Sequence, residues 1–311
     1  MKILVLGAGG IGGLTGGRLA EHGADVTFLV REKRKAQLDA DGLRIESPQG
    51  NATVRVRSVL KRDATPEYDV ILLTCKAYDL EGAIDTIGPA MSDRTAVLPL
   101  LNGVAHVERL NDAFGAHRVL GGTAKMQATL TADGIVKQLN DWQTITFGEQ
   151  GGDASARATS LQQLLAKTGI HAVLSANIVR DLWMKIVHLA TVAAGTCLMR
   201  ANIGEIVRTP DGTALLKRLL AMNAEIAAHN GHRADDAFLA TYLKLFETSD
   251  STYEASMLRD LERGGLIESE HVLGYMLNKC RAAGLDDTLH MAAYTHVKAY
   301  EQRRDAKRLT R

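Results

Sequence analysis

MKILVLGAGGIGGLTGGRLAEHGADVTFLVR, residues 1–31, decides the fold of the first half of the chain. Residues 2–6 begin with Lys2 and continue as an unbroken apolar run, which is typical of a strand buried on both faces of a parallel sheet. A G-x-G-x-x-G pattern follows at once, residues 14–22 have helical character, and a second apolar run occupies residues 26–30. This order predicts a strand–helix–strand unit, the context in which a glycine-rich turn binds a dinucleotide.

The positions of the glycine-rich turn have separate physical roles. Gly7 permits the tight turn, Gly9 lets the backbone approach a pyrophosphate, and Gly12 lets the helix pack closely on the strand. The N-terminus of the helix directs N–H groups and a partial positive charge at the anion. A bare glycine turn is the alternative, but the flanking strand and helix favour dinucleotide binding. The residues predicted to contact the pyrophosphate are Gly7, Ala8, Gly9, Gly10, Ile11 and Gly12.

The residue that ends the second predicted strand bears on which dinucleotide binds. NAD-binding proteins usually carry an acid there, which binds the ribose 2′-OH. This chain has Arg31 instead, at the start of the basic run REKRK. Because a guanidinium pairs bidentately with phosphate, the run favours NADP, whereas Glu32 keeps NAD open as an alternative. A solvated loop is the third interpretation of the run.

Length and composition limit the class of protein. A chain of 311 residues is too long for one small domain, so two domains are expected. The formal net charge of +1 gives no reason to expect a nucleic-acid or membrane partner. The three cysteines lie far apart without CxxC spacing, so neither a disulfide framework nor a metal site is predicted, and a reducing, cytoplasmic compartment is expected.

Further apolar runs extend the predicted sheet through the first half. Residues 42–46 and 53–56 alternate apolar and polar residues around a turn, which predicts a hairpin that elaborates the sheet. The other predicted elements are strands at 68–74, 96–101, 119–130, 143–148 and 171–174 and a helix at 156–168. Lys76 and Asn102 each follow a strand end, at the sheet edge where ligands of such folds bind. A solvent-facing lysine and a turn asparagine are the alternative interpretations.

Strand signals stop near residue 175, and helical periodicity replaces them. We therefore divide the chain into an α/β nucleotide-binding domain, residues 1–175, and an all-α domain, residues 176–311. Helices are predicted at residues 178–200, 211–229, 234–246, 269–283 and 288–303. The apolar stretch 182–199 contains Lys185 and His188, so it predicts a buried helix rather than a membrane span. A cleft between the domains is the expected ligand site.

Lys185 lies among large apolar residues of the first of these helices, in the sequence DLWMK. Burial disfavours the charged ammonium and lowers its pKa, which makes a lysine a usable general acid near neutral pH. An ammonium that reaches solvent from an otherwise buried helix is the alternative. Glu268 precedes a predicted helix with Ser269 as its N-cap, where a carboxylate is favourable in itself.

Taken in order, these motifs resemble those of the ketopantoate reductase (2-dehydropantoate 2-reductase) family over essentially the whole chain. The resemblance rests on ILVLGAGGIGG, LVR, LLTCKAYD, LNGV, LWMK, SMLRDLERG and IESEHVLG. It implies a Rossmann-type domain followed by an all-α domain, with NADPH as the cofactor and a small-molecule 2-oxo acid as the substrate. It also implies a cytoplasmic enzyme of pantothenate biosynthesis, and it is compatible with a homodimer.

The resemblance implies roles for single residues. Lys185 would donate the proton, Glu268 would orient hydroxyl groups of substrate or cofactor, and Ser256 would hold the polar end of the substrate. The residues implied to contact the cofactor are Arg31, at the 2′-phosphate, and Lys76, Asn102 and Ala128, near the nicotinamide. The chemistry is coherent, because an ammonium stabilises the charge that develops on a carbonyl oxygen during hydride transfer, and a nearby carboxylate keeps the lysine charged.

The chain departs from the family where the family has substrate-contacting asparagines. Leu189 and Ala193 stand four and eight residues after Lys185, and Ile203 stands at a third such position. Loss of such a contact typically costs ~1–3 kcal/mol per unpaired group. A reductase of a different, more apolar 2-oxo acid or ketone is therefore one alternative, and a non-catalytic NADP-binding sensor is another. The candidates for replacement polar contacts are His188, Thr191 and Thr196.

Overall fold

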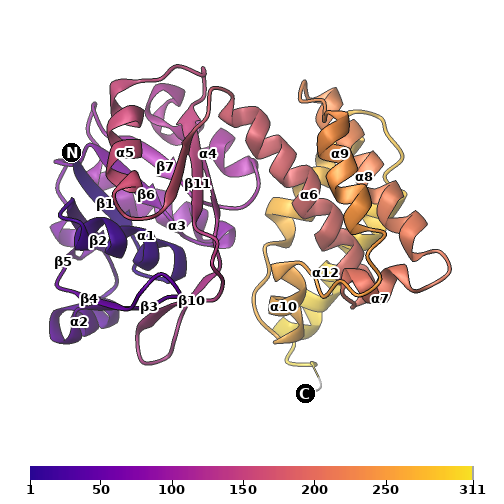
Figure 1. Ribbon diagram of the computed structural model, residues 1–311, viewed down its shortest axis with the longest axis horizontal. Coiled ribbons are helices and arrows are strands. Elements are labelled where there is room, and N and C mark those ends of the chain that lie inside the picture. Colours follow the sequence, from indigo (N-terminus) through magenta and orange to yellow (C-terminus); the bar gives the residue numbers. More distant parts are fainter. Residues whose placement is uncertain (310–311) are drawn as a thin grey trace. The chain divides into compact units, whose positions relative to one another are not determined.

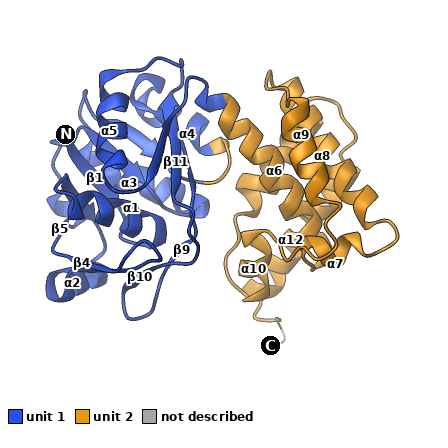
Figure 2. Ribbon diagram, viewed as in Figure 1, with its two compact units in different colours: residues 1–101, 106–179 blue, residues 102–105, 180–311 orange. Residues whose placement is uncertain are grey.

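The computed structural model describes residues 1–309, and the chain divides into two compact units (Figures 1 and 2). The first unit comprises residues 1–101 and 106–179, and the second comprises residues 102–105 and those from 180 onward. The change of unit lies after Val179 rather than at residue 175, because the start of the next helix still packs on the first unit. A Cβ atom on Gly121 would lie 2.8 Å from the side chain of Ile178.

A five-stranded parallel sheet forms the centre of the first unit (Figure 1). Its strands, in spatial order, are β5 (Arg57–Val59), β2 (Asp25–Leu29), β1 (Lys2–Leu6), β6 (Val70–Leu73) and β7 (Ala96–Pro99). The chain runs outward from β1 through β2 to β5 and then returns to the other side of β1, so the topological switch point lies between β1 and β6. Strands β6 and β7 are buried throughout, which explains their unbroken apolar runs.

Two smaller sheets complete the first unit. One contains, in order, β4 (Ala52–Val54), β3 (Leu43–Glu46), β10 (Ile135–Gln138) and β9 (Ala128–Leu130). The other contains β12 (His171–Leu174), β11 (Thr144–Glu149) and β8 (Leu120–Lys125). The predicted hairpin forms, as β3 and β4, but it belongs to a separate sheet rather than to the central one. The single run predicted at 119–130 is two strands, which belong to different sheets.

Helix α1 packs between the central sheet and the four-stranded sheet, and its glycines permit both contacts. A Cβ atom on Gly16 would lie 2.7 Å from Phe28 of β2, and one on Gly17 would lie 2.7 Å from Ile45 of β3. The helices of this unit are α1 (Gly10–Glu21), α2 (Glu32–Asp41), α3 (Leu80–Ile87), α4 (Ala105–Phe114) and α5 (Ala156–Ala166). Helix α1 begins inside the glycine-rich turn, and α2 occupies the basic run.

The second unit is helical, and no strand occurs among its described residues. Its helices are α6 (Ile178–Met199), α7 (Ile203–Val207), α8 (Gly212–His229), α9 (Asp236–Leu245), α10 (Ser256–Glu262), α11 (Tyr275–Ala282) and α12 (Thr288–Asp305). Sequence periodicity missed α7 and α10, which have 5 and 7 residues. Helix α6 is long and apolar enough to span a bilayer. However, 72% of its most apolar stretch is buried within the protein, so it is a core helix as predicted.

Candidate functional site

The glycine-rich turn lies at the carboxyl end of β1, at the switch point of the sheet. Gly7 has φ +89°, in the left-handed region that favours glycine, and Gly9 is the N-cap of α1 without a side chain to cap it. A Cβ atom on Gly9 would meet nothing within 4 Å, whereas one on Gly12 would lie 2.3 Å from Oγ1 of Thr74. The open space at Gly9 and the uncapped helix N-terminus fit the pyrophosphate of a dinucleotide.

Two further predicted cofactor residues lie beside this turn or after the strand next to β1. Ala128 is the first residue of β9, and a Cβ atom on Gly10 would lie 2.3 Å from its carbonyl oxygen. The fold thus brings Ala128 to the N-terminus of α1. Lys76 follows β6, the strand beside β1, and is the N-cap of the short 3₁₀ turn Ala77–Asp79.

Arg31 lies just beyond β2, where it is the N-cap residue of α2. Its side chain is exposed and forms no ion pair with any residue of the described part of the chain. Glu32, which kept NAD open, forms an ion pair with Arg62 at 3.0 Å between exposed side chains. Sequence reasoning missed Arg34, which donates from Nε to the carbonyl oxygen of Ala8 at 3.1 Å. The sequence did offer a signal for Arg34: residues three apart on a helix lie on the same face, and Arg34 stands three residues after Arg31.

Lys185 and Glu268 interact electrostatically in the second unit. Burial of Lys185 lowers the pKa of its ammonium from 10.5 to about 8, while the charge of Glu268 acts in the opposite direction. Glu268 is itself largely buried, with 9% of its surface exposed. By its exposed surface Lys185 is half-buried, so it is not a fully solvated lysine. A lysine in this state is suited to donate a proton near neutral pH.

The segment after Glu268 differs from the prediction. Ser269 occupies the N-cap position of the next turn, but its backbone is helical and its side chain makes no capping bond. Its hydroxyl donates instead to Oε1 of Glu301 at 2.5 Å. The chain continues as a π-helical turn, Glu270–Gly274, into α11. Such turns occur frequently at functional sites. The short segment that contains Asn102 packs against this turn, since a Cβ atom on Gly103 would lie 2.9 Å from the carbonyl oxygen of His271.

The remaining substrate-related positions lie on three helices of the second unit. Ser256 is the first residue of α10 and is exposed. Ala193 and Ile203, which replace family asparagines, are buried, and Leu189 is half-buried. At these three positions the chain has aliphatic side chains where the family has asparagine amides.

Two of the suggested replacement contacts are wrong. Thr191 and Thr196 are fully buried, and each hydroxyl donates at 2.7 Å to a backbone carbonyl one turn earlier in α6. Such back-bonding satisfies a helix threonine without any ligand. Their side chains therefore belong to the packed interior of the unit.

His188 instead belongs to a half-buried aromatic cluster that sequence reasoning missed. Its ring stacks on Tyr242 with centroids 4.2 Å apart, and its Nε2 lies 2.7 Å from the hydroxyl of Tyr253. Phe238 meets Tyr242 edge to face, with centroids 4.8 Å apart. Helix α9, which carries Phe238 and Tyr242, has no fully buried residue. The cluster therefore lies one helical turn beyond Lys185 and remains partly accessible.

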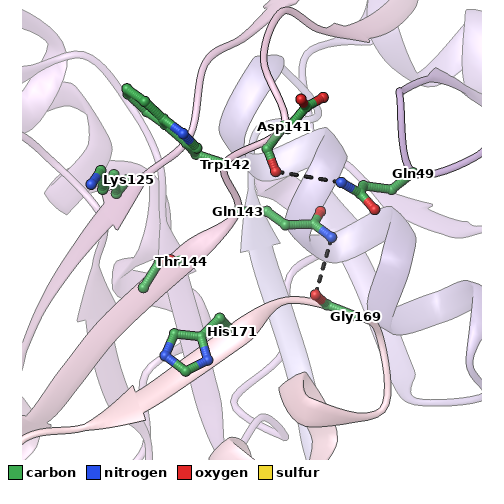
Figure 3. Close-up of a pocket in the computed structure, with 8 residues that line it drawn as sticks. All are labelled: Gln49, Lys125, Asp141, Trp142, Gln143, Thr144, Gly169 and His171. Atoms are coloured by element: carbon green, nitrogen blue, oxygen red, sulfur yellow. Dashed lines mark hydrogen bonds between the residues drawn. The ribbon is translucent and has the colours of Figure 1, made fainter.

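A separate open pocket of about 340 Å³ lies in the first unit (Figure 3). Its lining residues come from β8, β11, β12 and nearby loops: Gln49, Lys125, Asp141, Trp142, Gln143, Thr144, Gly169 and His171. Nζ of Lys125 lies 4.8 Å from the ring centroid of Trp142, which is 53% exposed. None of the residues predicted to bind cofactor or substrate lines this pocket. Within residues 1–309, no group of three or more metal-ligating side chains is found.

Comparison with known proteins agrees with this combination of units. The model of the family described as Ketopantoate reductase PanE/ApbA matches residues 3–152, and the model of its C-terminal domain matches residues 177–301. Uncharacterized oxidoreductase YkpB of Bacillus subtilis (strain 168) is 32% identical over 301 residues, 97% of this chain and 99% of that protein. A 2-dehydropantoate 2-reductase of Halobacterium salinarum is 28% identical and covers 90% of this chain and 92% of its own.

Solved structures share the fold at lower identity. A PanE/ApbA family ketopantoate reductase from Ralstonia eutropha JMP134 has 22% identity and a TM-score of 0.88, covering 98% of this chain and 100% of its own. D-mandelate dehydrogenase, solved with NADH and anilino(oxo)acetate, has 23% identity and a TM-score of 0.86, covering 98% and 99%. The comparisons confirm both the resemblance and the predicted fold class: the chain belongs to the ketopantoate reductase family of oxidoreductases, which act on CH–OH groups.

Proposed function

We propose that this protein is an NADPH-dependent reductase of a 2-oxo acid, with 2-dehydropantoate (ketopantoate) as the first substrate to test. The observation that supports the reaction is the half-buried Lys185, whose pKa is lowered by burial to about 8 while the carboxylate of Glu268 acts on it. Relatives named 2-dehydropantoate 2-reductase, from Halobacterium salinarum and Archaeoglobus fulgidus, support the choice of substrate. A cytoplasmic role in pantothenate biosynthesis follows from that substrate.

The proposed chemistry uses the two coupled groups of the second unit. NADPH, when bound, supplies the hydride for the C2 carbonyl. Lys185 stabilises the negative charge that develops on the carbonyl oxygen and donates a proton to it. Glu268 maintains the charged form of Lys185, and Ser256 binds the polar end of the substrate. Because the pKa of Lys185 is about 8, a large fraction of the lysine is charged at neutral pH.

The cofactor is proposed to bind along the carboxyl edge of the central sheet. Its pyrophosphate would lie on residues 7–12, where Gly9 leaves open space and α1 lacks a side-chain cap. Arg31 is proposed to bind the 2′-phosphate, while Lys76, Asn102 and Ala128 contact the nicotinamide half. The pairing of Glu32 with Arg62 supports NADP over NAD, because it engages the acidic residue that kept NAD open.

A reductase of a more apolar, aromatic 2-oxo acid is the second candidate, favoured by two observations. Leu189 and Ala193 replace amides that would bind a polar substrate. The aromatic cluster of His188, Tyr242 and Tyr253 lies one turn beyond Lys185 and is only half-buried. One solved structure of the same fold, D-mandelate dehydrogenase, contains anilino(oxo)acetate. A non-catalytic sensor is less well supported, because a pure binder needs neither Lys185 nor Glu268.

The test is a steady-state assay of NADPH and NADH oxidation against ketopantoate, aliphatic 2-oxo acids and phenylglyoxylate. We expect turnover of ketopantoate with NADPH preferred, and loss of about a hundredfold or more in kcat for Lys185→Met. Lys217→Met is the matched control, since Lys217 pairs with Glu247 on the surface of the same unit. A higher kcat/KM for phenylglyoxylate would favour the second candidate. Tight NADPH binding without turnover of any carbonyl would leave only the sensor.

A further inference from the structure

Arg34 contacts the glycine-rich loop directly. Besides its bond from Nε to Ala8, its Nη1 donates to the carbonyl oxygen of Gly134 at 2.9 Å, in the turn between β9 and β10. Nη1 also lies 3.3 Å from Oε1 of Gln37 in α2. One guanidinium therefore joins the loop, helix α2 and the four-stranded sheet.

The charge of Arg34 has no acidic partner in the described part of the chain. Its side chain is half-buried, and its Nη2 is shielded from solvent without a hydrogen-bond partner. Burial and the neighbouring Arg44 both lower the pKa of the guanidinium. A partly buried cation costs free energy unless an anion compensates it. Arg31 likewise forms no ion pair with a described residue. Arg44, by contrast, donates to the carbonyl oxygen of Asp133, and its charge contributes to the lowered pKa of the Asp133 carboxyl.

The bond to Ala8 also orients the backbone of the loop. In a trans peptide the carbonyl oxygen and the next N–H point in opposite directions, and all described peptide bonds are trans. Holding the carbonyl of Ala8 on Arg34 therefore turns the N–H of Gly9 to the opposite side. A Cβ atom on Gly9 would meet nothing within 4 Å, so the space around this residue is open.

We propose that Arg34 is a positioning residue for the dinucleotide: it fixes the Ala8–Gly9 peptide and adds positive charge beside the pyrophosphate site. The proposal rests on the proposed dinucleotide site and gives Arg34 a role different from that of Arg31. NADPH and NADH share the pyrophosphate, but only NADPH carries the 2′-phosphate. Arg34 should therefore act on both cofactors and Arg31 on NADPH alone.

Direct binding measurements test this. Titration of the purified protein with NADPH and with NADH, followed by nicotinamide fluorescence, gives the two dissociation constants without turnover. We expect Arg34→Gln to weaken both cofactors by the same factor, about tenfold to a hundredfold, since it removes a charge-assisted contact. Arg31→Gln should weaken NADPH only. Arg34→Lys keeps the charge but lacks the rigid fork in which Nε and Nη1 donate to separate carbonyls, so its loss should be intermediate.

The salt dependence of binding separates a charge role from a purely structural one. Arg34→Gln should make the NADPH dissociation constant less sensitive to ionic strength, a readout that a mere structural contact would not move. Arg55→Gln is the matched control, because Arg55 also donates to two backbone carbonyls, those of Asp39 and Ala40, away from the loop.

Two outcomes would overturn the proposal: unchanged affinity for both cofactors in Arg34→Gln, or loss of NADPH affinity alone, which would make Arg34 a second 2′-phosphate ligand. If Arg34→Gln does not fold, Arg34→Lys decides between the same outcomes. A wild-type protein that binds neither dinucleotide would refute the proposed function instead.

Discussion

Replacing Glu268 by glutamine removes the charge that acts on Lys185 while keeping the size of the side chain. Glu268 raises the pKa of Lys185 against the larger effect of burial, which brings that pKa to about 8. Without the carboxylate, the pKa of Lys185 must fall further. An opposite charge in close range typically shifts a pKa by about 1 to 3 units, so a fall of about 1 is a conservative expectation.

The size of the effect on rate follows from the titration. At pH 8, about half of wild-type Lys185 is charged, whereas with a pKa of about 7 only about one tenth would be. Proton donation needs the charged form, so the rate at pH 8 should fall about fivefold, and little should change at pH 6. The wild-type lowering from 10.5 to about 8 already corresponds to about 3 kcal/mol, so the electrostatic energies here are large enough for such a shift.

The assay is the initial rate of NADPH oxidation between pH 6 and pH 10 with saturating 2-oxo acid. For the wild type, the rate should fall tenfold per pH unit above about pH 8, and for Glu268→Gln above about pH 7. Lys185→Arg should show no such decline, because a guanidinium stays charged. Glu301→Gln is the control, since this carboxylate bonds Ser269 and Lys298 and should leave the decline near pH 8.

Two results would refute the reasoning. A decline that stays at pH 8 or moves to higher pH in Glu268→Gln would exclude the electrostatic coupling of Glu268 to Lys185. A wild-type rate that stays constant up to pH 10 would exclude Lys185 as the proton donor.

Three further predictions concern stability and the loop. Between pH 7 and pH 10 the free energy of unfolding of the wild type, measured in urea, should rise by about 2.5 kcal/mol relative to that of Lys185→Met. The reason is that the unfolded chain keeps the lysine proton up to about pH 10.5, whereas the folded protein releases it near pH 8. A difference between the two proteins that stays constant with pH would contradict the lowered pKa. Gly9→Ala should leave the unfolding temperature unchanged but weaken NADPH binding. Gly12→Ala should cost about 1–3 kcal/mol of stability, because its Cβ would lie 2.3 Å from Thr74 Oγ1. Equal melting curves for the two variants would disprove this contrast. Burial lowers the pKa of His290, so the unfolded chain takes up the proton first and stability should fall as the pH drops below about 6.5. His290→Gln should therefore lose less stability than the wild type between about pH 7 and pH 5. Equal losses in the two proteins would exclude this source of acid sensitivity.

Local sequence was sufficient for the central architecture. The apolar runs of β1, β6 and β7 predict buried parallel strands, because a strand covered on both faces needs apolar residues throughout. The left-handed conformation of Gly7 depends on that residue itself, so the turn is visible in the sequence. The ordered motifs also predicted the family, and the family models confirm it.

Contacts between residues far apart in the chain were decided only by the tertiary structure. The approach of Ala128 to Gly10, the bond from Arg34 to Gly134 and the bond from Ser269 to Glu301 join distant segments, so no local pattern predicts them. The environment of Lys185 was likewise decided by the tertiary structure. Its sequence neighbours allow either a solvated or a desolvated ammonium, and the pKa depends on which side chains of other helices surround the group, because desolvation and Coulomb interactions act through space rather than along the chain.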